Sequence, residues 1–554
     1  MRQMKILTSA EMVATDRRTA AEFAVPPGSL MEQAGGAVAK FCLRQYPGSR
    51  RVVVLCGKGN NGGDGLVAAR VLARAGKTVR VVLLGRASEV KGEAAVALDQ
   101  LETAGSQAWS AHVGAGIADM HKGSMSLVEM PDESGLTGVL DGAELVIDAV
   151  VGTGFKPPLR GSAVLLREMV AQAAAPVVAV DLPSGWDADS MEQSAEGAFR
   201  ADAVVTFTAP KLAHVFGHLT RDTFGPVVVA GIGSPAEAVE SATGLSWTGA
   251  SKSVAERPRE VNANKGKYGH VLVVGGSYGK AGAPAMASLA ALRAGAGLVT
   301  AAVPTGVLNT VAGVAPELMT VPLAEGPMGA VSFKDLRGAK LDSLLNRITV
   351  VALGPGLSTE GDAPAFARQM VEKTTLPIVI DADALTAFAG KTELLDGSGR
   401  AMVLTPHPGE MARLAGLTVQ EVEADRVELA RQFAMKHRLT LVLKGWRTLV
   451  AHPDGRVAVN TSGNPAMAKG GSGDILTGIV AAMLAQFPED VARAVEAAVY
   501  LHGLAGDFAA HAMDERAVLA TDTVMHLSDA FRYRIEDEDG LTWICGLRGR
   551  WGES

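Results

Sequence analysis

Side chains that could hold a cation or move a proton stand at the ends of three apolar runs in the first half of the sequence. Asn60, Asn61 and Asp64 lie in "GKGNNGGDG", which follows "RVVVLC". Asp148 lies in "AELVIDAVVGTG" and Asp181 in "PVVAVDLPSG". Carboxylate and amide oxygens are ligands for hard cations, and carboxylates also serve as general acids and bases. These residues predict a polar site, although aspartates at such places are also common turn caps.

The glycine-rich stretch 57–65 suggests phosphate binding, because glycines let a phosphate approach the backbone closely. A P-loop, however, requires Gly-Lys followed by Ser or Thr, and Lys58 is followed by Gly59. The stretch is therefore not a P-loop. A phosphate-binding turn, a simple tight turn and another kind of site all remain open, and we expect Lys58 to be a surface residue.

The second half carries a stronger signal in "GGSGD" (470–474), which leads directly into the apolar helical pattern "ILTGIVAAML". Backbone amides at a helix N-terminus bind anions. Asp474 at the start of that helix is either a general base beside a transferred phosphoryl group or a helix cap. His407 in "TPHPGE" and Lys444 in "LKGWRT" also follow apolar runs. Alone, His407 is more often a turn residue than a catalyst.

The elements that would position these residues are strands alternating with helices. The first series of expected strands covers 51–56, 78–85, 143–154, 176–185, 201–211 and 225–233, with a helix at 65–76. Nearly continuous apolar strands of this kind predict an α/β fold with a parallel sheet covered on both faces. Ligands bind such sheets at the carboxyl ends of the strands, where Asp64, Asp148 and Asp181 are expected.

A second α/β series begins at 270–277, after a stretch rich in Pro, Ser and charge. The sequence therefore predicts two domains, at 1–235 and 258–530. It also predicts a linker at 236–257 and a loosely held polar tail at 531–554.

Composition excludes several classes of protein. The chain of 554 residues has a formal net charge of −7, which argues against a nucleic-acid groove. Its 3 cysteines are too few and too scattered for a disulfide framework or a zinc site. No apolar run approaches the roughly 20 residues of a membrane span, and the first twenty residues lack a signal-peptide core. We expect a cytoplasmic protein that binds small molecules, with no membrane partner.

The motifs of the second half resemble a known superfamily. "GGSGD", "TPHPGE", "DADAL" (381–385), "GPGL" (354–357) and "GKAGAPAMASLAALRAGAGLV" resemble the ribokinase-like carbohydrate and vitamin kinases. The resemblance is closest to the nucleotide-dependent NAD(P)H-hydrate dehydratases, and it implies a ribokinase-like α/β/α domain. These enzymes phosphorylate the hydroxyl of a hydrated nicotinamide ring, and the phosphate then leaves. For two-domain bacterial members the resemblance implies ADP, with Mg²⁺ to neutralise phosphate charge.

The same resemblance assigns roles to residues of this half. Asp474 would be the catalytic base. The positions that match the nucleotide site are Lys444, Gly445, Trp446, Arg447, Thr448 and Gly473. The positions that match the site of the hydrated cofactor are Ala283, Gly356, His407 and Asp474.

In the first half, "GNNGGDG", "DAVVGTGFKPPLRG" and "DLPSGWDAD" resemble the NAD(P)H-hydrate epimerases, which have a Rossmann-like three-layer sandwich. The resemblance implies a K⁺ site made by Asn61, Asp148 and Ser184. It makes Asp181 a substrate contact and a candidate acid/base. The remaining substrate-binding positions that it implies are Asn60, Asn61, Gly62, Gly63, Asp64, Gly152, Thr153, Gly154, Phe155, Lys156, Pro157 and Pro158.

Together the two resemblances imply a bifunctional repair enzyme that self-associates. The enzyme would interconvert the R and S forms of hydrated NADH or NADPH and dehydrate the S form. Two alternatives remain open at this point. One is a ribokinase-like kinase of a small vitamin or sugar alcohol, whose product would keep the phosphate. The other is an enzyme whose first half only binds nucleotide.

Overall fold

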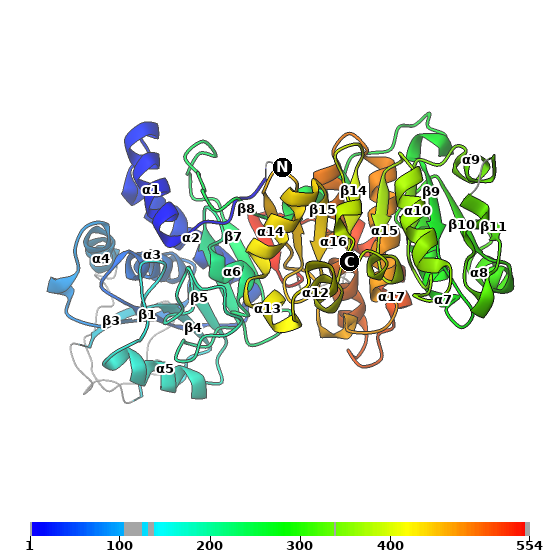
Figure 1. Ribbon diagram of the computed structural model, residues 1–554. Coiled ribbons are helices and arrows are strands. Elements are labelled where there is room, and N and C mark those ends of the chain that lie inside the picture. The colour runs from blue at the N-terminus through cyan, green and yellow to red at the C-terminus, as the bar shows by residue number, and fades with distance from the viewer. Residues whose placement is uncertain (1–2, 105–123, 131–137, 337–338, 549–554) are drawn as a thin grey trace. The chain divides into compact units, whose positions relative to one another are not determined.

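The computed structural model describes residues 3–104, 124–130, 138–336 and 339–548, and the chain divides into two compact units (Figure 1). The first unit comprises Lys5–Thr243 together with Arg534–Ser554. The second unit comprises Gly244–Tyr533 together with Met1–Met4. The last six residues of the expected tail, 549–554, lie outside the described residues.

The described part of the first unit forms a sheet of eight strands in the order β18-β7-β6-β5-β4-β1-β2-β3. All neighbours are parallel except β18, which runs antiparallel to β7. This is the parallel sheet that the apolar runs predict. The strands are β1 (Arg51–Cys56), β2 (Thr78–Leu83), β3 (Met125–Glu129), β4 (Leu145–Ala149), β5 (Val177–Val180), β6 (Ala203–Phe207), β7 (Val227–Ala230) and β18 (Leu541–Cys545).

Helices cover both faces of this sheet. Val52 and Val54 of β1 pack in one core with α2, α3 and α4, whereas Val53 and Leu55 pack in another with α5. The alternation confirms the predicted three-layer sandwich. The helices of the unit are α1 (Ser9–Phe23), α2 (Pro27–Gln45), α3 (Asn60–Arg74), η1 (Ala87–Glu89), α4 (Glu93–Ala104), α5 (Ser162–Gln172) and α6 (Leu212–Phe216).

The C-terminal segment is not the loose tail that its polar sequence suggests. Residues Leu541–Cys545 form β18 at the edge of the first unit's sheet. Trp543 is buried there, with its ring centroid 6.3 Å from that of Phe41, and its indole N–H donates to Asp537 Oδ2 at 3.1 Å. The apolar run "LTWIC" has only five residues and lies among charged neighbours, so the sequence does not mark it as a strand. Its pairing with β7 determines its conformation.

The second unit contains a sheet of ten strands among the described residues, in the order β11-β10-β9-β12-β13-β14-β15-β16-β17-β8. The strands from β11 to β15 are parallel, and β16 is antiparallel to both of its neighbours. The strands are β8 (Leu245–Trp247), β9 (His270–Val274), β10 (Leu298–Pro304), β11 (Met319–Leu323), β12 (Val350–Leu353), β13 (Ile378–Ile380), β14 (Met402–Leu404), β15 (Thr440–Leu443), β16 (Leu449–Ala451) and β17 (Val457–Val459).

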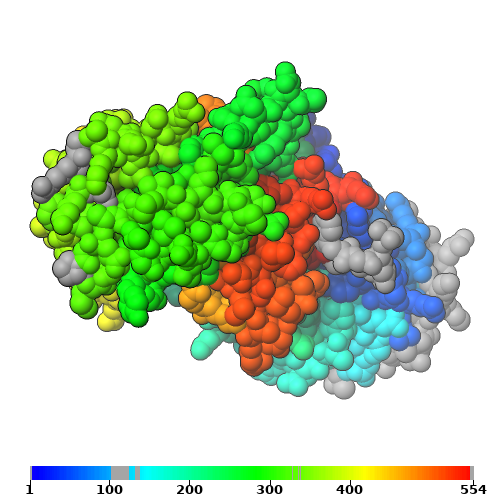
Figure 2. Space-filling view, turned by 90° about the vertical axis from the view of Figure 1, so that its right-hand side faces the viewer, coloured from blue at the N-terminus to red at the C-terminus, as the bar shows by residue number. Residues whose placement is uncertain are grey.

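The helices of this unit pack along the sheet and on one another. Helix α15 contacts α7, α16 and strands β9, β12 and β13. Figure 2 shows the orange-to-red residues of the last helices beside green residues of the same unit. Helix α16 also packs on η4. The helices are η4 (Thr248–Val254), η5 (Lys265–Tyr268), α7 (Gly282–Arg293), η6 (Thr305–Val307), α8 (Leu308–Ala312), η7 (Pro327–Gly329), η8 (Phe333–Leu336), α9 (Ala339–Leu345), α10 (Ala363–Lys373), α11 (Asp383–Thr386), η9 (Thr392–Leu394), α12 (Pro408–Ala415), α13 (Val419–Ala424), α14 (Arg426–His437), η10 (Pro465–Met467), α15 (Ser472–Gln486), α16 (Val491–Ala512), α17 (Ala520–Met525) and α18 (Leu527–Arg532).

The second unit begins earlier than its sequence pattern suggests. Much of the expected linker at 236–257 is ordered, because β8 pairs with β17 and η4 follows it directly. Trp247 is fully buried and donates its indole N–H to Thr461 Oγ1 at 2.7 Å. A three-residue strand gives too little periodicity to be recognised, so the linker and the start at residue 258 are corrected to a boundary at Gly244. None of the described helices has the length and hydropathy needed to cross a membrane.

Candidate active sites

The predicted site of the first unit lies at the carboxyl ends of β1, β4 and β5, and its glycine-rich stretch differs from the expectation. The helix expected at 65–76 begins at Asn60, so that 60–64 form its first turn instead of a loop. Gly59 is the N-cap residue and no side chain caps the helix. The first backbone amides of α3 are therefore placed to bind an anion.

The glycines of this turn are needed for packing. A Cβ atom at Gly62 would lie 1.9 Å from the carbonyl oxygen of Gly57, and one at Gly65 would lie 2.6 Å from Cβ of Ala149. Glycine at these two positions lets α3 start directly against the sheet. Lys58 is half-exposed and pairs with Glu89 at 3.2 Å, as expected for a surface residue.

Two of the three predicted cation ligands touch each other. Asp148 is fully buried, and its carboxylate accepts hydrogen bonds from Ser184 N at 2.7 Å and from Ser184 Oγ at 2.6 Å. The N–H of Val150 donates to the same carboxylate at 3.3 Å. Burial raises the pKa of Asp148 to about 6, and the hydrogen bonds from Ser184 oppose that rise. A buried carboxylate whose described partners are uncharged donors suits a bound cation.

The third predicted ligand, Asn61, lies beside the loop that follows β4. A Cβ atom at Gly152 would meet Asn61 Oδ1 at 2.7 Å and Asp181 Oδ2 at 3.1 Å. Asn61 Nδ2 is buried and has no hydrogen-bond partner in the described part of the chain. Among the described residues, the geometry links Asn61 with Gly152 and Asp181, whereas Asp148 and Ser184 contact each other.

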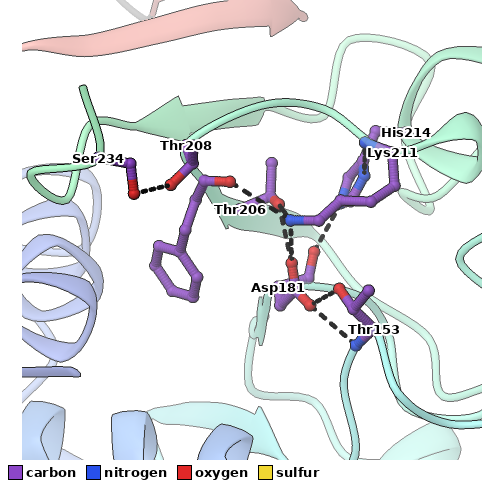
Figure 3. Close-up of polar contacts among 8 residues, drawn as sticks. Thr153, Asp181, Thr206, Thr208, Lys211, His214 and Ser234 are labelled. Carbon is purple, nitrogen blue, oxygen red and sulfur yellow. Dashed lines mark hydrogen bonds and ion pairs between the residues drawn. The ribbon is translucent and has the colours of Figure 1, made fainter. Parts of the chain in front are cut away.

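Asp181 is the most heavily bonded carboxylate of this site (Figure 3). It follows β5 with a φ of 66° and is buried. Its carboxylate accepts hydrogen bonds from Thr153 N at 2.9 Å, from Thr153 Oγ1, and from Thr206 Oγ1 at 2.8 Å. The fourth donor is the ammonium of Lys211, at 2.8 Å. Burial alone would raise its pKa, but the nearby Lys211 and His214 hold the pKa of Asp181 well below its usual range.

Lys211 and His214 were missed by the sequence analysis. Lys211 is buried and donates to Asp181 Oδ1 and to Thr206 Oγ1, both at 2.8 Å. His214 Nδ1 accepts the N–H of Lys211 at 3.0 Å, so Nε2 carries the proton and donates to the carbonyl oxygen of Asp181 at 2.7 Å. Burial lowers the pKa of His214 to about 4, with the charge of Lys211 as the next cause. Lys211 is the last residue of the segment 201–211, whose apolar sequence predicted only a strand.

A further carboxylate approaches this site from α1. Asp16 interacts electrostatically with Lys211 and Asp181, and its Oδ1 is buried without a hydrogen-bond partner among the described residues. Burial raises the pKa of Asp16 to about 6. Burial also raises the pKa of Asp64 well above its usual range, and the charges of Asp181 and Asp16 add to that rise. Nothing in the spacing of α1 marks Asp16, because the tertiary fold alone brings it here.

The loop after β4 holds the remaining predicted substrate contacts of the first unit. Gly152 and Thr153 adjoin Asp181, and the Phe155 N–H donates to the Gly152 carbonyl oxygen at 2.9 Å. Lys156 Nζ pairs with Asp187 at 2.7 Å and with Asp189 at 2.8 Å. Gly154 has open space around it, and the peptide between Pro157 and Pro158 is cis.

The predicted site of the second unit centres on Lys444, which follows β15. Its ammonium lies 3.0 Å from Asp381 Oδ1 and 3.9 Å from Glu410 Oε2. Asp381 follows β13, is buried, and also accepts a hydrogen bond from Thr477 Oγ1 of α15 at 2.7 Å. A Cβ atom at Gly473 would lie 3.2 Å from Lys444 Nζ. The predicted nucleotide residues Lys444 and Gly473 are therefore neighbours.

Asp474 is half-buried in the first turn of α15. Burial raises its pKa to about 7. The negative charges of Asp381, Asp383 and Glu410 add to the rise, and Lys444 opposes it. A carboxyl group with a pKa near neutrality is suited to general-base catalysis. No side chain caps α15 at its N-cap, Gly471, so the hydrogen-bond geometry gives no support for reading Asp474 as a cap.

His407 is held at the start of α12 by a reciprocal cap. Its Nδ1 accepts the Gly409 N–H at 3.0 Å, while its own N–H donates to the carboxylate of Glu410 at 2.8 Å. The ring is exposed. The reciprocal cap alone explains the position of His407. Glu410, which takes part in that cap, also lies near the ammonium of Lys444. The structural and the functional interpretations of His407 are compatible.

Ala283 and Gly356, which the sequence places far apart, lie together. A Cβ atom at Gly356 would be 3.2 Å from Cβ of Ala283 and 2.7 Å from the carbonyl oxygen of Lys280. Gly356 has a φ of 66° and accepts the hydroxyl of Ser277 at 2.9 Å. Lys280 pairs with Asp383 at 3.0 Å, and Asp383 is one of the charges that act on Asp474.

The rest of the predicted nucleotide segment is a turn with unusual backbone angles. Gly445 has a φ of 137° and Arg447 one of 53°. The Arg447 guanidinium lies over the half-exposed Trp446 ring, 4.3 Å from its centroid. Thr448 Oγ1 donates to the Gly445 carbonyl oxygen at 3.3 Å. Arg426 of α14 donates to the carbonyl oxygens of Lys444 and Trp446 and thereby holds the turn.

Both units match families of known proteins. Residues 271–529 match the family model of NAD(P)H-hydrate dehydratase, and residues 27–213 match that of the YjeF-related protein N-terminus. A solved structure described as an ADP/ATP-dependent NAD(P)H-hydrate dehydratase from Bacillus subtilis, co-crystallised with ATP/Mg²⁺, is 30% identical. It covers 51% of this chain and 96% of its own, with a TM-score of 0.43.

Relatives match almost the whole chain. A Bifunctional NAD(P)H-hydrate repair enzyme Nnr from Moorella thermoacetica is 41% identical over 98% of this chain and 99% of its own length. The protein of the same description from Escherichia coli is 34% identical over 92% of this chain and 90% of its own. The expected ribokinase-like class of the second unit and the two-domain organisation agree with these matches. The chain belongs to the family of bifunctional NAD(P)H-hydrate repair enzymes.

Proposed function

We propose that the first unit interconverts the R and S forms of hydrated NADH or NADPH. The second unit then dehydrates the S form, converting ADP into AMP and phosphate. The observation that carries this proposal is that one chain matches the family models of both units, and that a relative described as a bifunctional NAD(P)H-hydrate repair enzyme matches it over 98% of its residues. Epimerisation supplies the second unit with the form that it accepts, so the two activities form one sequence of reactions.

In the second unit, the roles follow from the charges around Asp474. Asp474 takes the proton of the ring hydroxyl as that oxygen attacks the β-phosphorus of ADP, and AMP leaves. The C–O bond then breaks and the departing phosphate takes a proton from the adjacent carbon, which restores the double bond. Lys444 and the backbone amides of residues 470–473 are the proposed phosphate contacts, which the proximity of Lys444 to Gly473 at the start of α15 supports. Mg²⁺ would enter with the nucleotide and neutralise phosphate charge.

The segment 444–448 suits the other end of the nucleotide. Trp446 presents a half-exposed aromatic face that Arg447 stiffens by stacking. Aromatic and guanidinium surfaces of this kind pack against flat heterocycles. His407, Ala283 and Gly356 are the proposed contacts of the hydrated cofactor, in agreement with the direct contact between the last two.

In the first unit, Asp181 is the proposed contact of the nicotinamide ring. The loop 152–158 and the first turn of α3 are the proposed contacts for the rest of the cofactor. The open space around Gly59 and Gly154 supports this placement. The unpartnered amides at the start of α3 would receive a phosphate group.

The residues present fit a potassium ion. Asp148 is a buried carboxylate with uncharged donors around it, and Ser184 adds a hydroxyl oxygen in direct contact with it. The amide oxygen of Asn61, which lies beside Gly152, is the proposed third ligand. Oxygen donors of this kind are what a hard cation prefers. The ion would supply positive charge where the cofactor's phosphates approach. Asn61→Ala should weaken the dependence of epimerisation on K⁺, measured by titrating KCl against a choline chloride background. Full retention of that dependence would exclude Asn61 as a ligand.

The test of the proposed function is a repair assay on a mixture of both hydrated epimers. The purified chain with Mg²⁺ and either ADP or ATP should restore the near-ultraviolet absorbance of reduced nicotinamide, with ADP the better donor. Accumulation of a stable phosphorylated product would favour the kinase alternative instead. Self-association remains a prediction, which light scattering on the purified chain would check.

A further inference from the structure

Asp16 has features that its position on α1 does not require. Helix α1 precedes the segment matched by the family model, and Asp16 is not a cap of that helix. The residue is half-buried, yet its Oδ1 is shielded and finds no hydrogen-bond partner in the described residues. A buried carboxylate oxygen without a donor is costly, so its retention calls for an explanation.

Asp181, unlike Asp16, has hydrogen-bond partners for both of its carboxylate oxygens. Its two carboxylate oxygens already accept four hydrogen bonds, one of them from the ammonium of Lys211. The lysine is itself fixed by Thr206, and His214 holds the backbone of Asp181 (Figure 3). A carboxylate bound in this way stays ionised, because a proton on it would displace the lysine contact. It can stabilise positive charge, but it is a poor carrier of protons.

The titratable and charged groups around Asp16 come from several elements. Met12, one turn before Asp16 on α1, packs against Ala209, which stands two residues before Lys211. Asp64 lies on α3, Asp181 follows β5, and Lys211 directly precedes α6. Burial raises the pKa of Asp16 to about 6, Lys211 lowers it and Asp181 raises it. Where two neighbouring carboxylates have pKa values shifted in opposite directions, one commonly transfers protons and the other stabilises charge.

We propose that Asp16 is the proton-transfer residue of the epimerase site, and that Asp181, fixed by Lys211 as a positioning residue, serves as a permanent anion beside the ring. This inference rests on the proposed epimerase activity. It adds a catalytic residue from outside the motifs that identify the unit, and it gives Asp181 a role other than acid/base.

The chemistry follows from the position of the hydroxyl. Hydration of an enamine double bond places the hydroxyl on the carbon next to the ring nitrogen. Protonated Asp16 gives its proton to that hydroxyl, the C–O bond breaks, and water leaves while the nitrogen lone pair forms a C=N⁺ bond. Asp181 stabilises this cation. Water then adds to the opposite face and returns a proton to Asp16, so that no oxidant, reductant or other reactant is consumed.

The experiment uses the full-length chain and purified R epimer, and it follows the formation of S epimer by chromatography. Asp16→Asn should lower the epimerisation rate by about 100-fold or more, as expected for loss of a general acid/base. Glu22→Gln, on the same helix at an exposed pair with Arg18, is the matched control and should keep the wild-type rate. ADP-dependent dehydration of S epimer by both variants should be unchanged, which reports a folded second unit. Near-ultraviolet circular dichroism of each variant reports the packing of the first unit.

Two further readouts separate a chemical role from a structural one. In ¹⁸O-labelled water, the wild-type chain should incorporate label into the ring hydroxyl at the rate of epimerisation, because the C–O bond breaks. The high-pH limb of the epimerisation rate profile, where Asp16 loses the proton that it must donate, should move in Asp16→Glu, which should regain part of the activity. A structural role would not move that limb.

Several results would overturn the inference. They are an Asp16→Asn rate within twofold of wild type, epimerisation without incorporation of label, or loss of the rate in Asp64→Asn but not in Asp16→Asn. A wild-type chain that fails to interconvert epimers would instead refute the proposed epimerase itself. The two failures are therefore distinguishable.

Discussion

Asp181 follows strand β5 and Asp474 lies in the first turn of α15, and their neighbours give these two carboxylates opposite properties. Lys211 and three other donors to its carboxylate keep Asp181 ionised. At Asp474, burial and three nearby carboxylates outweigh the single ammonium of Lys444 and raise the pKa to about 7. The sequence identifies both positions through their motifs. It does not reveal the difference, which depends on neighbours from other strands.

Asp474→Asn should abolish dehydration, with a loss of about 100-fold to 10,000-fold, because the amide cannot accept a proton. In the wild-type chain the base is active only when deprotonated. The single-turnover rate of dehydration should therefore fall about tenfold per pH unit below about 7 and become constant above it. Rapid-mixing measurements between about pH 5.5 and 8.5 would check this. A rate that does not change with pH would contradict the assignment of Asp474 as base.

Lys211→Met should destabilise the first unit, because it leaves the carboxylate of Asp181 buried without its cationic partner. Removing one member of a buried pair costs about 3–5 kcal/mol. Urea unfolding would measure the loss. The double variant Lys211→Met/Asp181→Asn should regain part of it, since the unpaired charge is then gone. If the double variant is less stable than Lys211→Met alone, the pair does not have the role inferred here.

At the scale of elements, strands that lie in a clear apolar run were predictable, including the three-residue strands β13, β14 and β17, whereas β8, β16 and β18 were not. The strands with continuous Val, Leu and Ile, such as β1 and β9, agree with the expected ranges. Strands β8 and β16 have three residues each and no longer apolar run around them, and β18 is isolated among charged residues. The start of α3 was misplaced because Gly-rich sequence favours a loop, whereas here it permits close packing.

Gly62→Ala should impair the epimerase unit selectively. The added methyl would lie 1.9 Å from the carbonyl oxygen of Gly57, so α3 or the turn before it must move. Overpacking of this kind lowers the free energy of unfolding by about 1–3 kcal/mol. The movement would also displace Asn61, which lies in the same turn. Epimerisation should fall while ADP-dependent dehydration is unchanged. Gly36→Ala, in open space on α2, is the control and should have no effect on either activity.

Trp543→Ala should show that β18 is an integral part of the first unit. The indole is buried against Phe41 and bonded to Asp537, and truncating a buried aromatic residue costs about 3–5 kcal/mol. The epimerase activity of the variant should be lost at a lower temperature than its dehydratase activity, measured by activity after graded heating. Equal loss of both activities would contradict the assignment of this strand to the first unit.

At the scale of the whole molecule, the two units supply two parts of one repair. The second unit has the proposed base, Asp474, and the proposed phosphate-binding amides at the start of α15, and the first has an ionised Asp181 and a second, less constrained carboxylate, Asp16. Each unit has its own sheet and its own core. A variant can therefore lose one activity and keep the other. Two variants with different losses should restore the complete repair when they are mixed.

The most direct test of bifunctional repair combines two single variants on an equal mixture of R and S hydrated NADH with Mg²⁺ and ADP. The wild-type chain should restore the absorbance of all the substrate. Asp181→Asn should rapidly restore only the S portion, Asp474→Asn should restore none, and a mixture of the two variants should again restore all of it. Full and rapid conversion by Asp181→Asn alone, or no recovery of absorbance by the wild-type chain, would contradict the account.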